Sequence, residues 1–179
     1  MELINVQRLN GRIYPLLVGV FLGTLQTGLF LQLMFTYSSG FSTYLMMTLC
    51  WLVGSALGVS YAARWGVRTG IFLLAAMAAY LTCVGLLHLR PFDTRLWPVY
   101  AILIVTAGVY PGVFFARLSQ TNRVASIFLW ENNGFIVGLV AGTVLYMLIG
   151  RLALWIIPLL AALLLFRVTE VQPVTDQTS

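Results

Sequence analysis

The chain has 179 residues, of which 60% are hydrophobic and only 8% are charged, and its formal net charge is +5. A soluble domain carries about a quarter charged residues, so this composition excludes a water-soluble globular protein. All ten basic residues are arginines scattered singly or in pairs, so no continuous basic face is available to bind nucleic acid. The sequence therefore predicts one domain surrounded by the lipid bilayer.

Six apolar runs follow one another along the chain. A helix needs roughly 20 apolar residues to cross the hydrocarbon core, and most of the runs are close to that length. In chain order they are 13–35, 43–63, 69–89, 96–116, 124–149 and 152–166. We therefore expect an all-α, polytopic membrane bundle of six transmembrane helices. The whole chain divides into an N-terminal segment (1–12), a six-helix transmembrane domain (13–167) and a polar tail (168–179).

The arginines at the ends of these runs predict the topology. With six spans both termini share a side, and that side holds seven arginines against three on the other. Arginine in short loops is concentrated on the cytoplasmic side of membrane proteins, so both termini are expected in the cytoplasm. This distribution favours a prokaryotic inner (cytoplasmic) membrane.

Glycines spaced by four predict close contacts between helices, because small residues let helix backbones approach in lipid. Packing alone is a sufficient interpretation of each stripe. Two prolines are expected to distort helices: Pro111 should kink or break the fourth run, and Pro158 should bend the sixth. The glycines of the stripes are Gly19, Gly23, Gly54, Gly58, Gly134, Gly138 and Gly142.

Glu131 is the single acid at membrane depth, since the other four acids fall in tails or a loop. An ionisable group inside a bilayer costs roughly 3 kcal/mol, so it is a functional candidate by default. On a helical wheel it lies on the face of Gly134 and Gly138 and should point into the protein. Gln26 lies on the corresponding face of the first run. If these faces pack together, Gln26 and Glu131 line a shared cavity.

Three interpretations of Glu131 stay open. It binds a cation or proton in a transport path; or it is a neutral structural acid hydrogen-bonded to Gln26 or an asparagine; or it pairs with Arg117 or Arg123. Asn132 and Asn133 turn progressively away from it, so at most one of them can join it.

The sequence has few residues that could bind a metal ion or haem, or form the active site of a hydrolase. His88 is the only histidine, and the two cysteines, Cys50 and Cys83, have no CxxC spacing. Zinc sites and bis-histidine haem need several such ligands close together. The chain is therefore expected to bind no metal or cofactor by itself, and not to be an enzyme.

Three stretches resemble the membrane domain of spermidine synthase-like membrane proteins. They are the stretches 19–26, 51–58 and 128–138. In the stretch from Gly19 to Gln26, Gln26 stands where that family has Glu. The last of the three is similar to the family's Tyr-x-x-Asp-x-x-Gly-x-x-x-Gly motif, with Phe128 for the Tyr and Glu131 for the Asp.

The loop 62–68 also resembles the motif between helices two and three of the major facilitator superfamily. Arg64, Gly66 and Arg68 fit that motif, and Ala63 replaces its Asp. The resemblance implies a six-helix repeat, similar to half of a facilitator-type transporter.

Two functions follow as hypotheses. The first is a non-catalytic membrane subunit or scaffold that anchors a larger membrane complex, such as an electron-transfer assembly. The alternative is a half-size secondary transporter, acting as a homodimer on a small cationic or proton-coupled solute. In the alternative Glu131 binds charge, Gln26 supplies a hydrogen bond, and Trp130 or Tyr110 stacks on the cation. The expected partners are a second copy or other membrane subunits.

Overall fold

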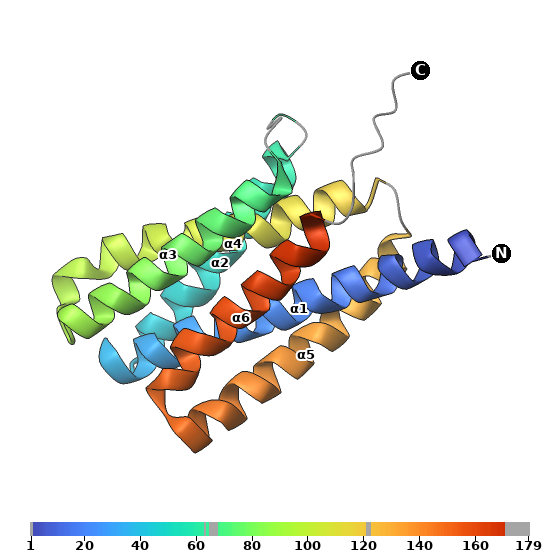
Figure 1. The fold of residues 1–179 in the computed structure, drawn as a ribbon. Coiled ribbons are helices and arrows are strands. Elements are labelled where there is room, and N and C mark those ends of the chain that lie inside the picture. The colour runs from blue at the N-terminus through green and yellow to red at the C-terminus, as the bar shows by residue number, and fades with distance from the viewer. Residues whose placement is uncertain (1, 63, 65–67, 121–122, 171–179) are drawn as a thin grey trace.

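The computed structural model describes residues 2–62, 64, 68–120 and 123–170, and the side chains of 12–62, 64, 68–120 and 123–168 among them. This part of the chain folds into six α-helices and one 3₁₀ turn (Figure 1). In chain order the elements are α1 (Glu2–Thr36), α2 (Phe41–Tyr61), α3 (Thr69–Leu89), η1 (Thr94–Leu96), α4 (Trp97–Leu118), α5 (Val124–Ile149) and α6 (Arg151–Glu170).

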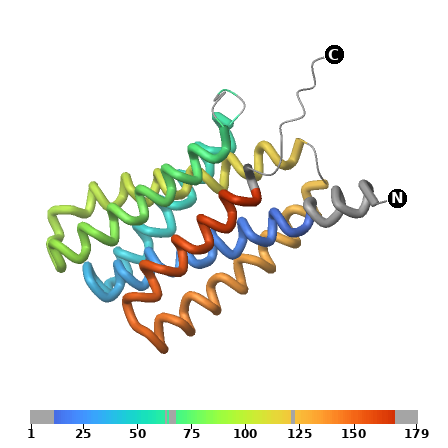
Figure 2. Tube along the Cα trace, in the orientation of Figure 1, coloured from blue at the N-terminus to red at the C-terminus, as the bar shows by residue number. Residues whose placement is uncertain are grey.

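All six helices are long and apolar enough to cross a membrane, which confirms the predicted fold class of a multi-pass helical membrane protein. α1 begins at Glu2, well before its apolar stretch, because a helix bonds its own backbone and can continue beyond the hydrocarbon core. Pro111 and Pro158 lie inside continuous helices, so Pro111 does not break α4. The coloured N-terminal part of α1 and the coloured C-terminal part of α6 lie at the same end of the bundle (Figure 2).

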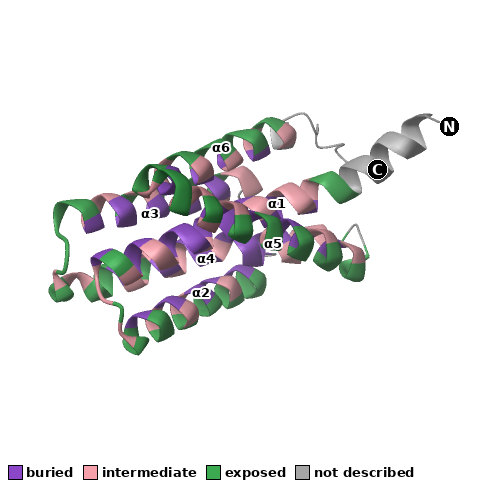
Figure 3. Cartoon of the chain, turned by 90° about the horizontal axis from the view of Figure 1, so that it is seen from below, coloured by how far each residue is buried: buried purple, intermediate pink, exposed green. Residues whose placement is uncertain are grey.

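α1 and α4 form the centre of the bundle, as their many buried residues in Figure 3 show. α5 packs along α1, and α2 packs along α4. α3 lies against α4, and α6 lies against α1. α5, α2 and α6 are the helices that expose most of their surface, and their exposed side chains are mainly apolar.

Glycines make the contact between α1 and α5. A Cβ added to Gly19 or Gly23 would overlap the backbone carbonyls of α5, and one added to Gly134 or Gly138 would overlap those of α1. The carbonyl groups concerned are those of Glu131, Phe135, Leu16 and Val20. The two helix backbones therefore touch directly, with no side chains between them.

The contact between α2 and α4 is built in the same way. Gly54 and Gly58 of α2 lie against α4 carbonyls, and Gly108 and Gly112 of α4 lie against α2 carbonyls. Ser55 adds a hydrogen bond from its hydroxyl to the Gly108 carbonyl, at 3.1 Å. Gly108 and Gly112 complete a fourth stripe with the same spacing as the stripes in α1, α2 and α5.

The two glycine contacts are related by an internal repeat. Exchanging α1 with α4, α2 with α5 and α3 with α6 turns the α1–α5 pair into the α4–α2 pair, and the α1–α6 pair into the α4–α3 pair. Consecutive helices run in opposite directions, so α1 and α4 are antiparallel (Figure 1). The main contacts of α1 and α4 thus correspond between two three-helix halves in inverted orientation, whereas the α5–α6 and α1–α3 contacts have no comparable counterpart.

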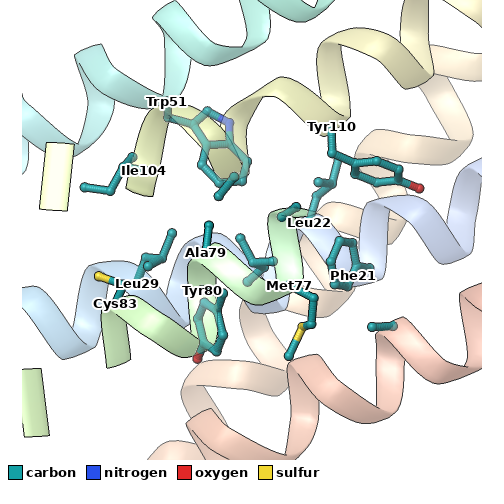
Figure 4. Packing of buried hydrophobic residues seen from close by; sticks show 14 of the residues in the cluster. Phe21, Leu22, Leu29, Trp51, Met77, Ala79, Tyr80, Cys83, Ile104 and Tyr110 are labelled. Carbon is teal, nitrogen blue, oxygen red and sulfur yellow. The ribbon is translucent and has the colours of Figure 1, made fainter. Parts of the chain in front are cut away.

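Large side chains fill the interior between the halves (Figure 4). Tyr80 of α3 is fully buried, and its hydroxyl donates a hydrogen bond to the Leu154 carbonyl of α6. The Phe21 and Tyr110 rings meet edge to face, with centroids 5.8 Å apart, and join α1 to α4. Edge-to-face pairs are favourable because the ring edge is positive and the ring face negative. These contacts fix the central helices that carry the cavity described next.

The glycine contacts predict a sharp difference between two alanine substitutions in α5. Gly134→Ala should destabilise the protein by about 1–3 kcal/mol, because the new methyl group meets the rigid backbone of α1. Gly142→Ala is the matched control: its Cβ would lie 3.7 Å from the Thr27 side chain, an ordinary contact. It should be neutral or stabilising by up to about 1 kcal/mol. Thermal unfolding in detergent measures both, and equal effects would contradict the backbone contact.

Candidate intramembrane binding site

A cavity of about 360 Å³ lies where α1, α2, α4 and α5 meet. The lining residues come from all four helices, with most of them in α2 and α4. They are Leu22 and Gln26 of α1, Trp51, Leu52, Ser55, Ala56 and Val59 of α2, Pro111, Gly112 and Phe115 of α4, and Glu131 and Phe135 of α5. Eight of them are equivalent in pairs when the glycines are aligned: Leu22 with Pro111, Gln26 with Phe115, Trp51 with Glu131, and Ser55 with Phe135. The cavity therefore lies between helices of the two halves.

Glu131 is buried in this cavity wall, with 7% of its surface exposed. It precedes Gly134 by three residues and so lies on the face of α5 that packs on α1. It is seven residues from the start of α5, or roughly 10 Å along the axis, which is within reach of the hydrocarbon core. The glycine contact thus holds an ionisable side chain at membrane depth inside the protein.

Gln26 of α1 lines the same cavity, so the structure brings the two predicted polar residues together. Neither side chain forms a hydrogen bond or an ion pair with another residue whose side chain is described. The carboxyl of Glu131 and the amide of Gln26 are therefore both available to a bound molecule. Buried polar groups are normally hydrogen-bonded, so an unpaired carboxyl next to an unpaired amide is a mark of a binding site.

The arginines near the start of α5 do not neutralise Glu131. Arg117 donates a hydrogen bond to the Thr69 hydroxyl at 3.0 Å and lies over the Phe72 ring, with the guanidinium carbon 5.8 Å from its centroid. Both partners are in α3, which is not among the helices that pack on α5. Arg123 is exposed. Among the described residues, no ion pair reaches Glu131.

Four other side chains that the sequence predicts as binding candidates lie away from the cavity. Asn132 and Asn133 are exposed on the outer face of α5, because successive residues turn by 100° around the helix. Trp130 lies under the Arg12 guanidinium, whose carbon is 5.7 Å from the ring centroid. Tyr110 is buried against Phe21 and is hydrogen-bonded to the hydroxyl of Tyr14.

Trp51 and Ser55 are cavity residues that sequence reasoning missed. The signal was present in the glycine spacing. Trp51 precedes Gly54 by three residues, just as Glu131 precedes Gly134. The same alignment pairs Gln26 with Phe115. The α1–α5 side of the cavity consequently carries a carboxyl and an amide, and the α2–α4 side carries the rings of Trp51 and Phe115 among smaller, mainly apolar residues.

The facilitator-like loop is only partly described. The Arg64 guanidinium carbon lies 5.5 Å from the centroid of the Tyr61 ring, and Arg68 precedes the first residue of α3 in extended conformation. Gly66 lies outside the described residues. Within the described ranges, no three His, Cys, Asp or Glu side chains gather where they could hold a metal ion.

Comparisons with protein-family models, curated proteins and solved structures give no match. The resemblance to spermidine synthase-like membrane proteins and to the facilitator superfamily therefore stays a prediction.

Substituting Glu131 tests whether its carboxyl has a structural role. Because no described residue bonds to it, Glu131→Gln should change the free energy of unfolding by less than about 0.5 kcal/mol, or stabilise the protein. Breaking a buried ion pair would instead cost about 3–5 kcal/mol. Thermal unfolding of purified protein in detergent distinguishes the two. A large loss of stability would show that the carboxyl is bonded within the protein.

Proposed function

We propose that this protein is a half-size secondary transporter that binds a small organic cation in the cavity between its two halves. One observation carries the proposal: Glu131 and Gln26, neither with a described partner, line an intramembrane cavity that also holds the rings of Trp51 and Phe115. Ionisable residues inside a membrane mark substrate or ion pathways in many transporters.

The chemistry of the lining residues favours a cation over an anion or a neutral solute. Glu131 supplies the only described acid in the cavity wall, and no basic residue lines it. Trp51 and Phe115 offer aromatic rings, which attract cations through the negative face of the ring. Gln26 can accept a hydrogen bond from an ammonium group or orient a polar substituent. A volume of about 360 Å³ is within the range of small-molecule sites, at its lower end.

A single six-helix unit needs a second half to alternate access to the two sides of the membrane. Inverted repeats rock against each other around a fixed site, and the full path in facilitator-type transporters takes two six-helix units. The cavity is bordered by exposed residues of α2, such as Leu52 and Val59. A second copy of the chain placed on this side would complete the path. The arginine distribution supports cytoplasmic termini for such a dimer.

A non-catalytic subunit of a larger membrane complex is the second candidate. α5 exposes the amides of Asn132 and Asn133 on its outer face, and no described residue hydrogen-bonds to either side chain. Polar side chains in lipid join helices by hydrogen bonds, so a helix of another chain would satisfy them. In a scaffold of this kind, replacing both asparagines with leucine would release the partner, and Glu131→Gln would have no effect.

Uptake by proteoliposomes tests the transporter directly, with labelled tetraethylammonium as the probe cation. The wild-type protein should show saturable uptake, and Glu131→Gln should reduce it at least tenfold, because the cavity loses its only charge. Asp93→Asn is the control. Asp93 lies in the loop after α3, and its carboxylate accepts a hydrogen bond from the Arg95 backbone N–H at 3.0 Å. The amide oxygen of asparagine can accept the same hydrogen bond. Full uptake by Glu131→Gln would contradict the proposal, and no uptake by wild type would favour the scaffold.

A further inference from the structure

A second, smaller cavity of about 180 Å³ lies at the other end of the bundle, where α1 and α3 end and α6 begins. Gln32 and Thr36 of α1, His88 of α3, and Arg151 and Trp155 of α6 line it. The loop after α3 is tied to this end of α1, because the Phe92 backbone N–H donates to the Thr36 carbonyl at 2.8 Å. None of these residues belongs to the Glu131 cavity.

Two deeply buried polar side chains in this wall lack partners. Thr36 is 2% exposed, and its hydroxyl oxygen makes no hydrogen bond in the structure. Gln32 is 4% exposed, and no described residue bonds to its amide. A buried polar group without a partner costs about 1–3 kcal/mol, so such groups normally have a role. Both line the same small cavity, which indicates a bound polar group there.

The charged and polar groups around the cavity indicate whether the bound group is an anion or a cation. Arg151 is the first residue of α6, and among the described residues no acid lines the cavity. α6 presents its N-terminus at this place, where the first backbone N–H groups of a helix lack intrahelical acceptors and the helix dipole is positive. Thr36, Gln32 and His88 add side chains that can donate hydrogen bonds. Arg151 supplies a positive charge beside these donors, so the arrangement suits an anion with several oxygens.

We propose that this cavity binds a phosphate group, held by Arg151, the Thr36 hydroxyl, the Gln32 amide and the start of α6. Arginine and helix N-termini are the usual ligands of phosphate oxygens. The cavity lies where membrane-spanning helices end, which is also where lipid phosphates lie. The phosphate can thus come from an anionic lipid headgroup or from free inorganic phosphate. This site is independent of the proposed transport function.

Two binding measurements on the purified, delipidated full-length protein distinguish a lipid headgroup from free inorganic phosphate as the ligand. Native mass spectrometry counts phosphatidylglycerol retained per chain, and thermal unfolding in a neutral detergent reports stabilisation by inorganic phosphate. Arg151→Gln and Thr36→Val are the test variants. Arg95→Gln is the matched control, since Arg95 is an exposed arginine at the same end of the bundle that does not line the cavity. Circular dichroism checks that each variant is folded.

We expect Arg151→Gln to weaken binding at least tenfold, and Arg95→Gln to bind as wild type does. Thr36→Val should weaken binding while leaving the ligand-free protein as stable as before, because the hydroxyl has no partner to lose. Retention of lipid would identify a headgroup site, and stabilisation by inorganic phosphate alone would identify a free-anion site. The proposal is overturned if wild type binds neither, or if Arg151→Gln binds both as wild type does.

Discussion

The direct backbone contact between α1 and α5 is the constraint on which the rest of the structure depends. Gly19, Gly23, Gly134 and Gly138 remove the side chains that would otherwise separate the helices. Lipid offers little hydrophobic driving force for helix association, so such contacts supply much of the attraction. The contact also fixes the rotation of α5 about its axis. That rotation turns Glu131 into the protein instead of toward lipid.

The inverted repeat explains why a cavity lies next to this contact. Each glycine contact joins one helix of each half, and between the α1–α5 and α2–α4 contacts the four helices enclose a space. The two contacts differ in what they place there. Glu131 and Gln26 of the α1–α5 pair occupy the positions that Trp51 and Phe115 occupy in the α2–α4 pair, so similar backbone contacts carry an asymmetric site. The difference between equivalent positions is what gives the cavity its chemistry.

Sequence patterns were sufficient for the helices and for the direction of Glu131. Length and hydropathy identify six spans, and the 100° turn per residue places Glu131 on the glycine face. The glycine spacing also places Trp51 on the packed face of α2, but it does not show that this face borders the Glu131 cavity, because that depends on how α2 packs on α4. Trp130 does not line the cavity and lies under Arg12 of α1, a contact that the residue spacing within α5 does not indicate. Contacts between helices distant in sequence leave little trace in local periodicity.

Labelling of Glu131 by a hydrophobic carbodiimide tests the central claim most directly. This reagent forms a stable adduct with a carboxylic acid in an apolar environment, and peptide mass spectrometry locates the modified residue. If the Glu131 carboxyl is unpaired in a ligand-accessible cavity, it should be labelled in membranes, and tetraethylammonium should protect it. A Glu131 that stays unlabelled under conditions that modify other membrane carboxylates would contradict the account, because it would show that the carboxyl is sealed inside the protein.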